Sequence, residues 1–303
     1  MTASTRAVGL VAFFTLMLIA LMMGANHVAA RLAFNDGLDV ATGVAVRSWV
    51  TASVLAVVVW LVRVPWRANA AQGKGLLIVG LAIGLKSQCL YSSVARLPVA
   101  LALLGFNTYP LWTAFWDRVL YGRRTEPAVL KAMPVILLGL ALALDVVGAS
   151  SGLGAADQWQ AMGVGVAFAL TGGAVFGLAL VWTQHETQGV DGRVRTIATM
   201  AMSGVVALAV MAGQGGPHWP QTTLGWGGLA ALTFLYGTAF TIMFTVLPKL
   251  GVVGNSAIMN VEPIFALVLA WGLLGQAIAP MQLVGAAVVV STVMWLGLRK
   301  PKP

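Results

Sequence analysis

Two short stretches of the sequence decide how the fold is understood. Residues 103–110 read Leu-Leu-Gly-Phe-Asn-Thr-Tyr-Pro, and residues 256–263 read Ser-Ala-Ile-Met-Asn-Val-Glu-Pro. The two stretches lie 153 residues apart, and each carries an asparagine three residues before a proline. Because both lie in long apolar runs, this shared spacing indicates that the second half of the chain repeats the first.

The repeat extends outward from these two stretches. At the same shift, residues 75–132 align on residues 228–285 without a gap, and several glycines and prolines coincide. The matched positions include Gly75 with Gly228, Gly84 with Gly237, Gly122 with Gly275, and Pro127 with Pro280. The shift corresponds to five apolar spans, an odd number, so the two copies would cross a membrane in opposite directions. The sequence therefore predicts an inverted pair, a first five-helix repeat in residues 1–150 and a second in residues 151–303.

The composition is that of an integral membrane protein. Of 303 residues, 59% are hydrophobic and only 9% are charged, whereas soluble domains average about 45–50% and about 25%. This balance excludes a soluble globular domain and a disordered chain. The single cysteine, Cys89, excludes an internal disulfide. The three histidines and the cysteine show no spacing typical of metal ligands, so we expect no metal site.

Ten apolar runs are long enough to cross a bilayer as helices. They predict an all-α membrane protein with ten transmembrane helices rather than a barrel of short alternating strands. The predicted spans cover residues 7–30, 40–61, 76–95, 98–117, 128–147, 160–183, 196–213, 225–247, 252–274 and 280–298.

The basic residues predict the orientation of these spans. With the N-terminus inside, most of the 18 Lys and Arg residues fall in cytoplasmic segments, whereas the outer loops hold only Arg31 and Arg96. This distribution follows the positive-inside rule, so both termini are expected in the cytoplasm. It also accounts for the net charge of +9, which therefore does not indicate a nucleic-acid partner.

The combination of these features resembles the drug/metabolite transporter superfamily, and within it the EamA-type exporters. The segment from Asn255 to Pro263, ending in Glu-Pro, is similar to the pattern of that family's ninth helix. The first copy has Tyr109 where the second has Glu262, so an acidic function is not doubled. The chain is most similar to the YddG-type aromatic amino-acid exporters of bacterial inner membranes. The resemblance implies a secondary transporter that exports amino acids, with aromatic or apolar side chains, or related small metabolites, by alternating access.

Three ionisable residues stand out within the predicted spans, where an unpaired charge costs about 2.5–3.5 kcal/mol. Glu262 is expected near the middle of the span 252–274, where it would bind a substrate ammonium or carry a proton. The alternative is a packing carboxylate, neutral or paired with Lys86 or Arg47, that fixes the positions of the helices. Lys86 either meets a substrate carboxylate or forms a structural ion pair. Arg47 either faces the substrate or snorkels to the outer interface.

Six further polar residues complete the candidate substrate site. The two asparagines would satisfy carbonyls released by the neighbouring prolines or hydrogen-bond a ligand, and the histidine titrates near neutrality unless it is a structural group. The tyrosines would face a cavity or a partner helix, and the glutamine lies on a polar helix face. These residues are Asn107, Asn260, Tyr109, Tyr236, Gln88 and His27. We predict that Glu262, Lys86, Asn107, Asn260 and Tyr109 surround one central cavity.

No motif indicates an enzyme. The sequence has no P-loop, no His-Glu-x-x-His and no Gly-x-Ser-x-Gly. We therefore expect no catalytic activity and no cofactor. The expected partners are a small-molecule substrate and membrane lipid, with protons as a third if Glu262 or His27 carries them. A membrane receptor or structural protein, and less readily an intramembrane lipid enzyme, are the alternative functions.

Overall fold

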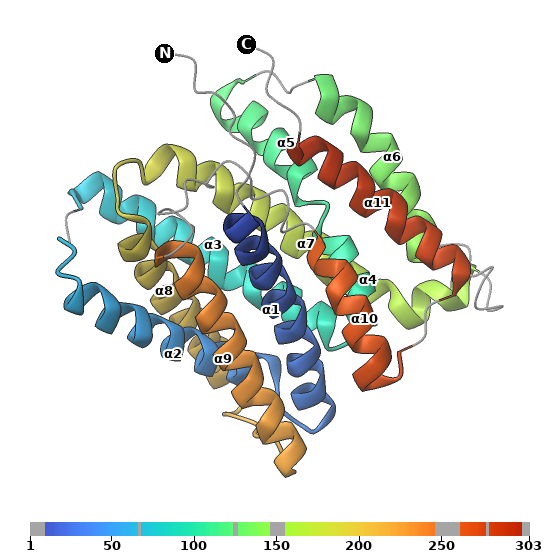
Figure 1. Cartoon of the computed structure of the whole chain (residues 1–303), viewed down its shortest axis with the longest axis horizontal. Helices are drawn as coiled ribbons and strands as arrows, with labels where there is room; N and C mark the ends of the chain where they lie inside the picture. Colours follow the sequence, from blue (N-terminus) through green and yellow to red (C-terminus); the bar gives the residue numbers. More distant parts are fainter. Residues whose placement is uncertain are drawn as a thin grey trace.

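The structure, a computed structural model, describes residues 10–65, 68–123, 127–145, 155–245, 261–276 and 279–298. All the regular structure in these ranges is helical (Figure 1). The helices are α1 (Leu10–Asn35), α2 (Val40–Leu61), α3 (Ala70–Val94), α4 (Val99–Phe106), α5 (Tyr109–Tyr121), α6 (Pro127–Ala143), α7 (Ala155–Glu186), α8 (Gly192–Gly213), α9 (Thr223–Thr245), α10 (Glu262–Leu274) and α11 (Pro280–Leu298).

Six helices in the described ranges are each long and apolar enough to cross a membrane, and the chain is a multi-pass membrane protein. They are α1, α2, α3, α7, α8 and α9. Shorter apolar helices are found in α6, α10 and α11. The all-helical fold class is therefore confirmed, whereas the ten transmembrane crossings remain a prediction.

The predicted span 98–117 is broken into two helices. The helix α4 ends at Phe106, and α5 begins at Tyr109 with Pro110 in its first turn. Proline has no amide hydrogen to donate to the carbonyl four residues back, and its ring clashes with the preceding turn. The hydroxyl of Thr108 instead donates to the Gly105 carbonyl over 2.8 Å, which satisfies an acceptor at the break. The helical structure of residues 98–117 is therefore interrupted in the middle of the bundle, between α4 and α5.

The start of α10 corrects the expectation for Glu262. Glu262 is the first residue of α10, with Pro263 beside it in the first turn, rather than a residue inside a continuous kinked helix. Residues 246–260, which include the N-terminal part of the predicted span, lie outside the described residues. Proline is favoured in a first helical turn because its missing amide hydrogen is not needed there. The Glu-Pro pair thus marks a helix start.

The helix bounds follow the same 153-residue spacing as the sequence. The starts of α3 and α9, of α5 and α10, and of α6 and α11 are each separated by that interval. The helices α5 and α10 also end at equivalent glycines, Gly122 and Gly275, whose φ angles of 65° and 63° are left-handed. Such angles are readily adopted by glycine, which has no Cβ atom.

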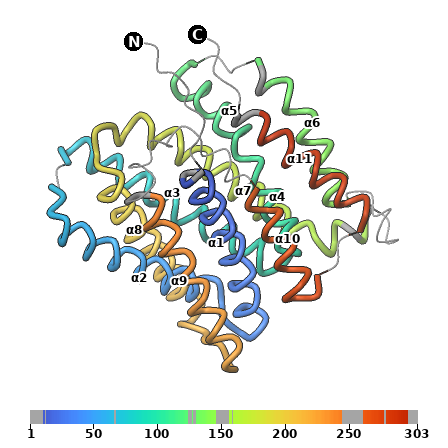
Figure 2. Tube along the Cα trace, viewed as in Figure 1, coloured from blue at the N-terminus to red at the C-terminus, as the bar shows by residue number. Residues whose placement is uncertain are grey.

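The packing of the helices has the same twofold pattern. The helix α7 packs on α3 and α5, and α1 packs on the corresponding helices α9 and α10. The pairs α2 with α8 and α6 with α11 join equivalent positions of the two halves. The tube view in Figure 2 shows α6 and α11 side by side at one edge, beyond α7 and α10.

Two glycines at equivalent positions bring helices into close contact. A Cβ atom on Gly177 of α7 would lie 2.7 Å from the backbone nitrogen of Thr113 in α5. A Cβ atom on Gly24 of α1 would lie 3.0 Å from the backbone nitrogen of Ala266 in α10. Small residues permit such approaches between membrane helices. They hold the interrupted segment α4–α5 against α7, and the start of α10 against α1.

Contacts between turns define two opposite faces of the bundle. On the first, here named the α1–α2 face, the Asp36 carboxylate accepts hydrogen bonds from the backbone of Gln221 and Thr222 in the α8–α9 turn. On the second, the α7–α8 face, the Gln72 side chain donates to the carbonyl of Gln188. The sequence predicts that the first face is extracytoplasmic and the second cytoplasmic.

Candidate functional site

A cavity of about 410 Å³ lies in the middle of the helix bundle. Its walls come from α1, α3, α7, α8 and α9, together with the break between α4 and α5 and the first turn of α10. The cavity extends from this break toward the α7–α8 face, where Thr183 and Arg195 line it. On the opposite side, the α1–α2 face, tightly packed apolar residues such as Leu97 and Leu101 fill the space. Among the residues that the structure describes, the cavity therefore extends toward the α7–α8 face.

The acidic group of the cavity is Glu262, which contacts a buried histidine. Glu262 and His27 both line it, and His27 Nε2 lies 3.2 Å from Glu262 Oε1. The His27 side chain is 3% exposed and that of Glu262 is 23% exposed, so the carboxylate is the more accessible partner. As the first residue of α10, Glu262 also lies at the positive end of a helix dipole, which favours a negative charge. The pairing of Glu262 with Lys86 or Arg47, one of the sequence alternatives, is wrong in this structure.

Lys86 brings a cation to the same cavity. Its ammonium nitrogen lies 5.0 Å from the ring centroids of both Phe106 and Phe176. Aromatic faces attract a cation through their quadrupole, and the attraction strengthens where water is excluded. No ion pair involving Lys86 occurs between described residues. The ammonium is therefore held by rings rather than by a carboxylate, and it remains available to an anionic group.

The break between α4 and α5 supplies neutral polar groups. Asn107 and Tyr109 both line the cavity, and the Tyr109 ring packs edge-on against Phe176 at 5.0 Å. On the facing wall, the Tyr236 ring packs against Phe240 in a tilted geometry with centroids 4.4 Å apart, and its hydroxyl contacts the sulfur of Met200 at 3.6 Å. The cavity thus combines polar groups with a mainly aromatic and aliphatic surface.

Two of the nine candidate residues lie elsewhere, and a third is not among the described residues. Arg47 and Gln88 are buried but do not line the cavity, and Asn260 lies outside the described residues. The suggestion that Arg47 snorkels to the interface is wrong. Its side chain is buried and donates hydrogen bonds to Tyr91 and Ser87 inside the bundle. The structure therefore brings together Glu262, Lys86, Asn107, Tyr109, Tyr236 and His27, whereas their binding roles remain a prediction.

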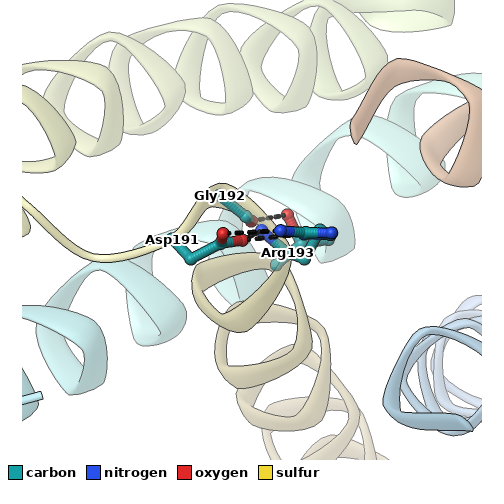
Figure 3. Close-up of polar contacts among 4 residues, drawn as sticks. Asp191, Gly192 and Arg193 are labelled. Carbon is teal, nitrogen blue, oxygen red and sulfur yellow. Dashed lines mark hydrogen bonds and ion pairs between the residues drawn. The ribbon is translucent and has the colours of Figure 1, made fainter. Parts of the chain in front are cut away.

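The cavity wall formed by α7 and α8 is not indicated by any motif in the sequence. Arg195 and Thr199 line it, although the sequence pattern presents Arg195 only as a charge that sets the orientation. The start of α8 is fixed by Asp191, whose carboxylate accepts from the backbone amide of Arg193 at 2.8 Å and pairs with its guanidinium (Figure 3). The Arg193 side chain holds the pKa of Asp191 below its usual range. This cap positions the first turn of α8, and with it Arg195, at the end of the cavity.

Residues 163–298 match the model of the EamA-like transporter family. This match supports the EamA and drug/metabolite transporter superfamily and indicates a membrane transporter of small solutes. No curated protein matches the chain. A solved crystal structure matches with a TM-score of 0.58 and 18% sequence identity, over 93% of this chain and 95% of that chain. At this identity the similarity shows a shared fold.

Proposed function

We propose that the protein is a secondary transporter that exports amino acids with aromatic or apolar side chains, or related small metabolites, by alternating access. In this proposal ten helices form two inverted five-helix repeats, residues 1–150 and residues 151–303. The membrane is the bacterial inner membrane, with both termini in the cytoplasm. The proposed activity is that of the YddG-type aromatic amino-acid exporters, which the sequence resembles.

The observation that carries the proposal is the presence of opposite charges on one cavity. A carboxylate, Glu262, and an ammonium, Lys86, both line it without pairing to each other. An amino-acid zwitterion needs a partner of each sign and neutral hydrogen-bonding groups such as Asn107. The rings of Phe106 and Phe176 offer a surface for an aromatic or apolar side chain.

The twofold arrangement of the helices supports alternating access. Equivalent helices begin 153 residues apart and make equivalent contacts. In transporters built from inverted repeats, the two halves exchange conformations and expose a shared central site to each side in turn. Interrupted helices near the midplane are typical of such sites. The break at Asn107 and the start of α10 at Glu262 both lie at this cavity.

The His27–Glu262 pair supports protons as a partner in transport. A substrate ammonium would displace His27 from Glu262, since both groups would donate to the same carboxylate oxygen atoms. An imidazole that is released from a carboxylate changes its affinity for a proton, because the neighbouring charge is the main stabiliser of the imidazolium. Proton movement would then accompany substrate movement.

The proposal is tested in liposomes that contain purified protein. The assay measures flux of radiolabelled amino acids, with L-phenylalanine first, in the presence and absence of a pH gradient. Glu262→Gln and Lys86→Gln should each lower the flux at least tenfold. Lys74→Gln, which removes an exposed lysine outside the cavity, should leave it unchanged. Flux no higher than in empty vesicles for every amino acid would refute the proposal, and saturable binding without flux would favour a receptor.

A further inference from the structure

Arg47 is a buried cation outside the cavity. Only 1% of the residue is exposed, and its guanidinium donates to the Tyr91 hydroxyl at 2.9 Å and to the Ser87 hydroxyl at 3.2 Å. Its Nε atom has no hydrogen-bond partner, and no carboxylate pairs with it among the residues that the structure describes. An unpaired charge in a dry interior is costly. The arrangement therefore suits a cation whose partner arrives in another state of the protein.

The ring of Tyr236 separates this cation from the cavity. The Arg47 guanidinium carbon lies 3.9 Å from the centroid of that ring, and Tyr236 itself lines the cavity. A second ring, Tyr91, lies 4.7 Å from the same carbon, and its hydroxyl donates to Asn26 over 2.8 Å. The displacement of one aromatic side chain would open a path from the cavity to Arg47.

The repeat indicates when this path opens. At the 153-residue shift, Arg47 corresponds to Met200 and Ser87 corresponds to Phe240, and both of these counterparts line the present cavity. When the two halves exchange conformations, residues of the first half take the places that their counterparts occupy here. Arg47 and Ser87 would then line a cavity that extends toward the α1–α2 face.

We propose that Arg47, Ser87 and Tyr91 form a second anion-binding site, which joins the central cavity only when it opens to the α1–α2 face. The site deepens the proposed function and rests on it, because it takes the carboxylate of the amino acid. Arginine suits this role, since its planar fork binds a carboxylate through two hydrogen bonds. The carboxylate passes from Lys86 in one state to Arg47 in the other, while Glu262 remains the partner of the ammonium.

The test needs no knowledge of the substrate. A single cysteine, Ser87→Cys in a Cys89→Ala background, is labelled in oriented vesicles by two impermeant methanethiosulfonate reagents, one carrying a sulfonate and the other a trimethylammonium group. Thr199→Cys in the same background is the matched control, because Thr199 lines the present cavity. We expect position 87 to react from the α1–α2 face and position 199 from the α7–α8 face.

The charge preference of the reaction tests the anion site itself. At position 87 the sulfonate reagent should react faster relative to the cationic reagent, and Arg47→Gln should reduce this ratio about tenfold, because the reagents differ by two unit charges. Arg47→Lys should retain the preference, and the ratio at position 199 should not change. A purely structural role for Arg47 would leave the ratio at position 87 unaltered.

Three outcomes would overturn the proposal. In the first, position 87 is not labelled from the α1–α2 face while position 199 reacts normally. In the second, Arg47→Gln does not change the ratio of the two reaction rates at position 87. In the third, position 87 of the parent protein reacts faster with the cationic reagent. If Arg47→Gln does not fold, the proposal is judged by whether position 87 prefers the sulfonate reagent in the parent protein and in Arg47→Lys. Anion preference with no amino-acid flux would refute the proposed function and leave the site in place.

Discussion

Removal of the contact between His27 and Glu262 gives the most direct energetic test of the cavity. The bond joins a buried imidazole to a carboxylate at 3.2 Å. A hydrogen bond to a charged group contributes about 1.5–3 kcal/mol to stability. Because the Glu262 side chain is 23% exposed, solvent weakens the pair, and we expect about 1–2 kcal/mol.

A single substitution would not reveal this energy. His27 Nδ1 is buried without a hydrogen-bond partner among the described residues, so His27→Leu removes an unfavourable group together with the favourable contact. Leucine is also the residue at the equivalent position of the second repeat, Leu180. A double-mutant cycle with His27→Leu, Glu262→Gln and the double variant isolates the pairwise energy from such effects.

The assay is unfolding in mixed detergent micelles, in which the free energy is measured for the four proteins. The expected coupling is about 1–2 kcal/mol in favour of the native pair. The control cycle combines His27→Leu with Lys74→Gln, whose side chain is exposed and does not line the cavity, and should give a coupling near zero. A His27–Glu262 coupling no larger than that of the control would show that the two side chains do not form this pair, and the account of the cavity would fail.

Three further predictions concern a turn, a helix contact and the orientation. The hydrogen bonds from Thr222 and Gln221 hold the pKa of Asp36 below its usual range; amide exchange at position 222 should therefore stay slow above the ordinary aspartate pKa of about 3.9 and accelerate as the pH falls through the lowered value. Gly177→Leu should destabilise the protein by about 1–3 kcal/mol in thermal unfolding through overpacking, whereas Gly272→Leu should not, because a Cβ atom on Gly272 would have no other atom within 4 Å. Single cysteines at positions 74 and 36 should label from the cytoplasm and from outside, and the reverse pattern would refute the orientation.

The helical class can be predicted from the sequence because the relevant signals are local. Apolar length and the low proportion of charges determine whether a segment can cross a bilayer. The starts of α5 and α10 follow from Pro110 and Pro263, since proline favours a first helical turn. The breaks themselves are harder to predict. A hydropathy average over residues 98–117 reports only how apolar the segment is, and it does not register the backbone hydrogen bond that is lost at a proline.

The partners of the charged residues cannot be predicted from the sequence. The pattern places Glu262 beside Lys86 or Arg47, but its partner is His27 on α1. Which charges meet depends on the rotation of each helix about its axis and on close approaches such as that of Gly24 to the first turn of α10. These properties result from packing between helices distant in sequence. A pattern of residues within one helix does not contain them.

The cavity combines a repeated framework with chemistry that occurs once. At the 153-residue shift Glu262 corresponds to Tyr109, Lys86 to Ala239 and His27 to Leu180, and all of these residues line the cavity. The positions are thus paired, but Glu262, Lys86 and His27 each have a counterpart that is neutral at physiological pH. A symmetric pair of carboxylates in one low-dielectric site would repel each other, and one would have to bind a proton. In the proposed function, one carboxylate and one ammonium on a framework of two similar halves would hold a single zwitterion, which corresponds to one substrate molecule in each transport cycle.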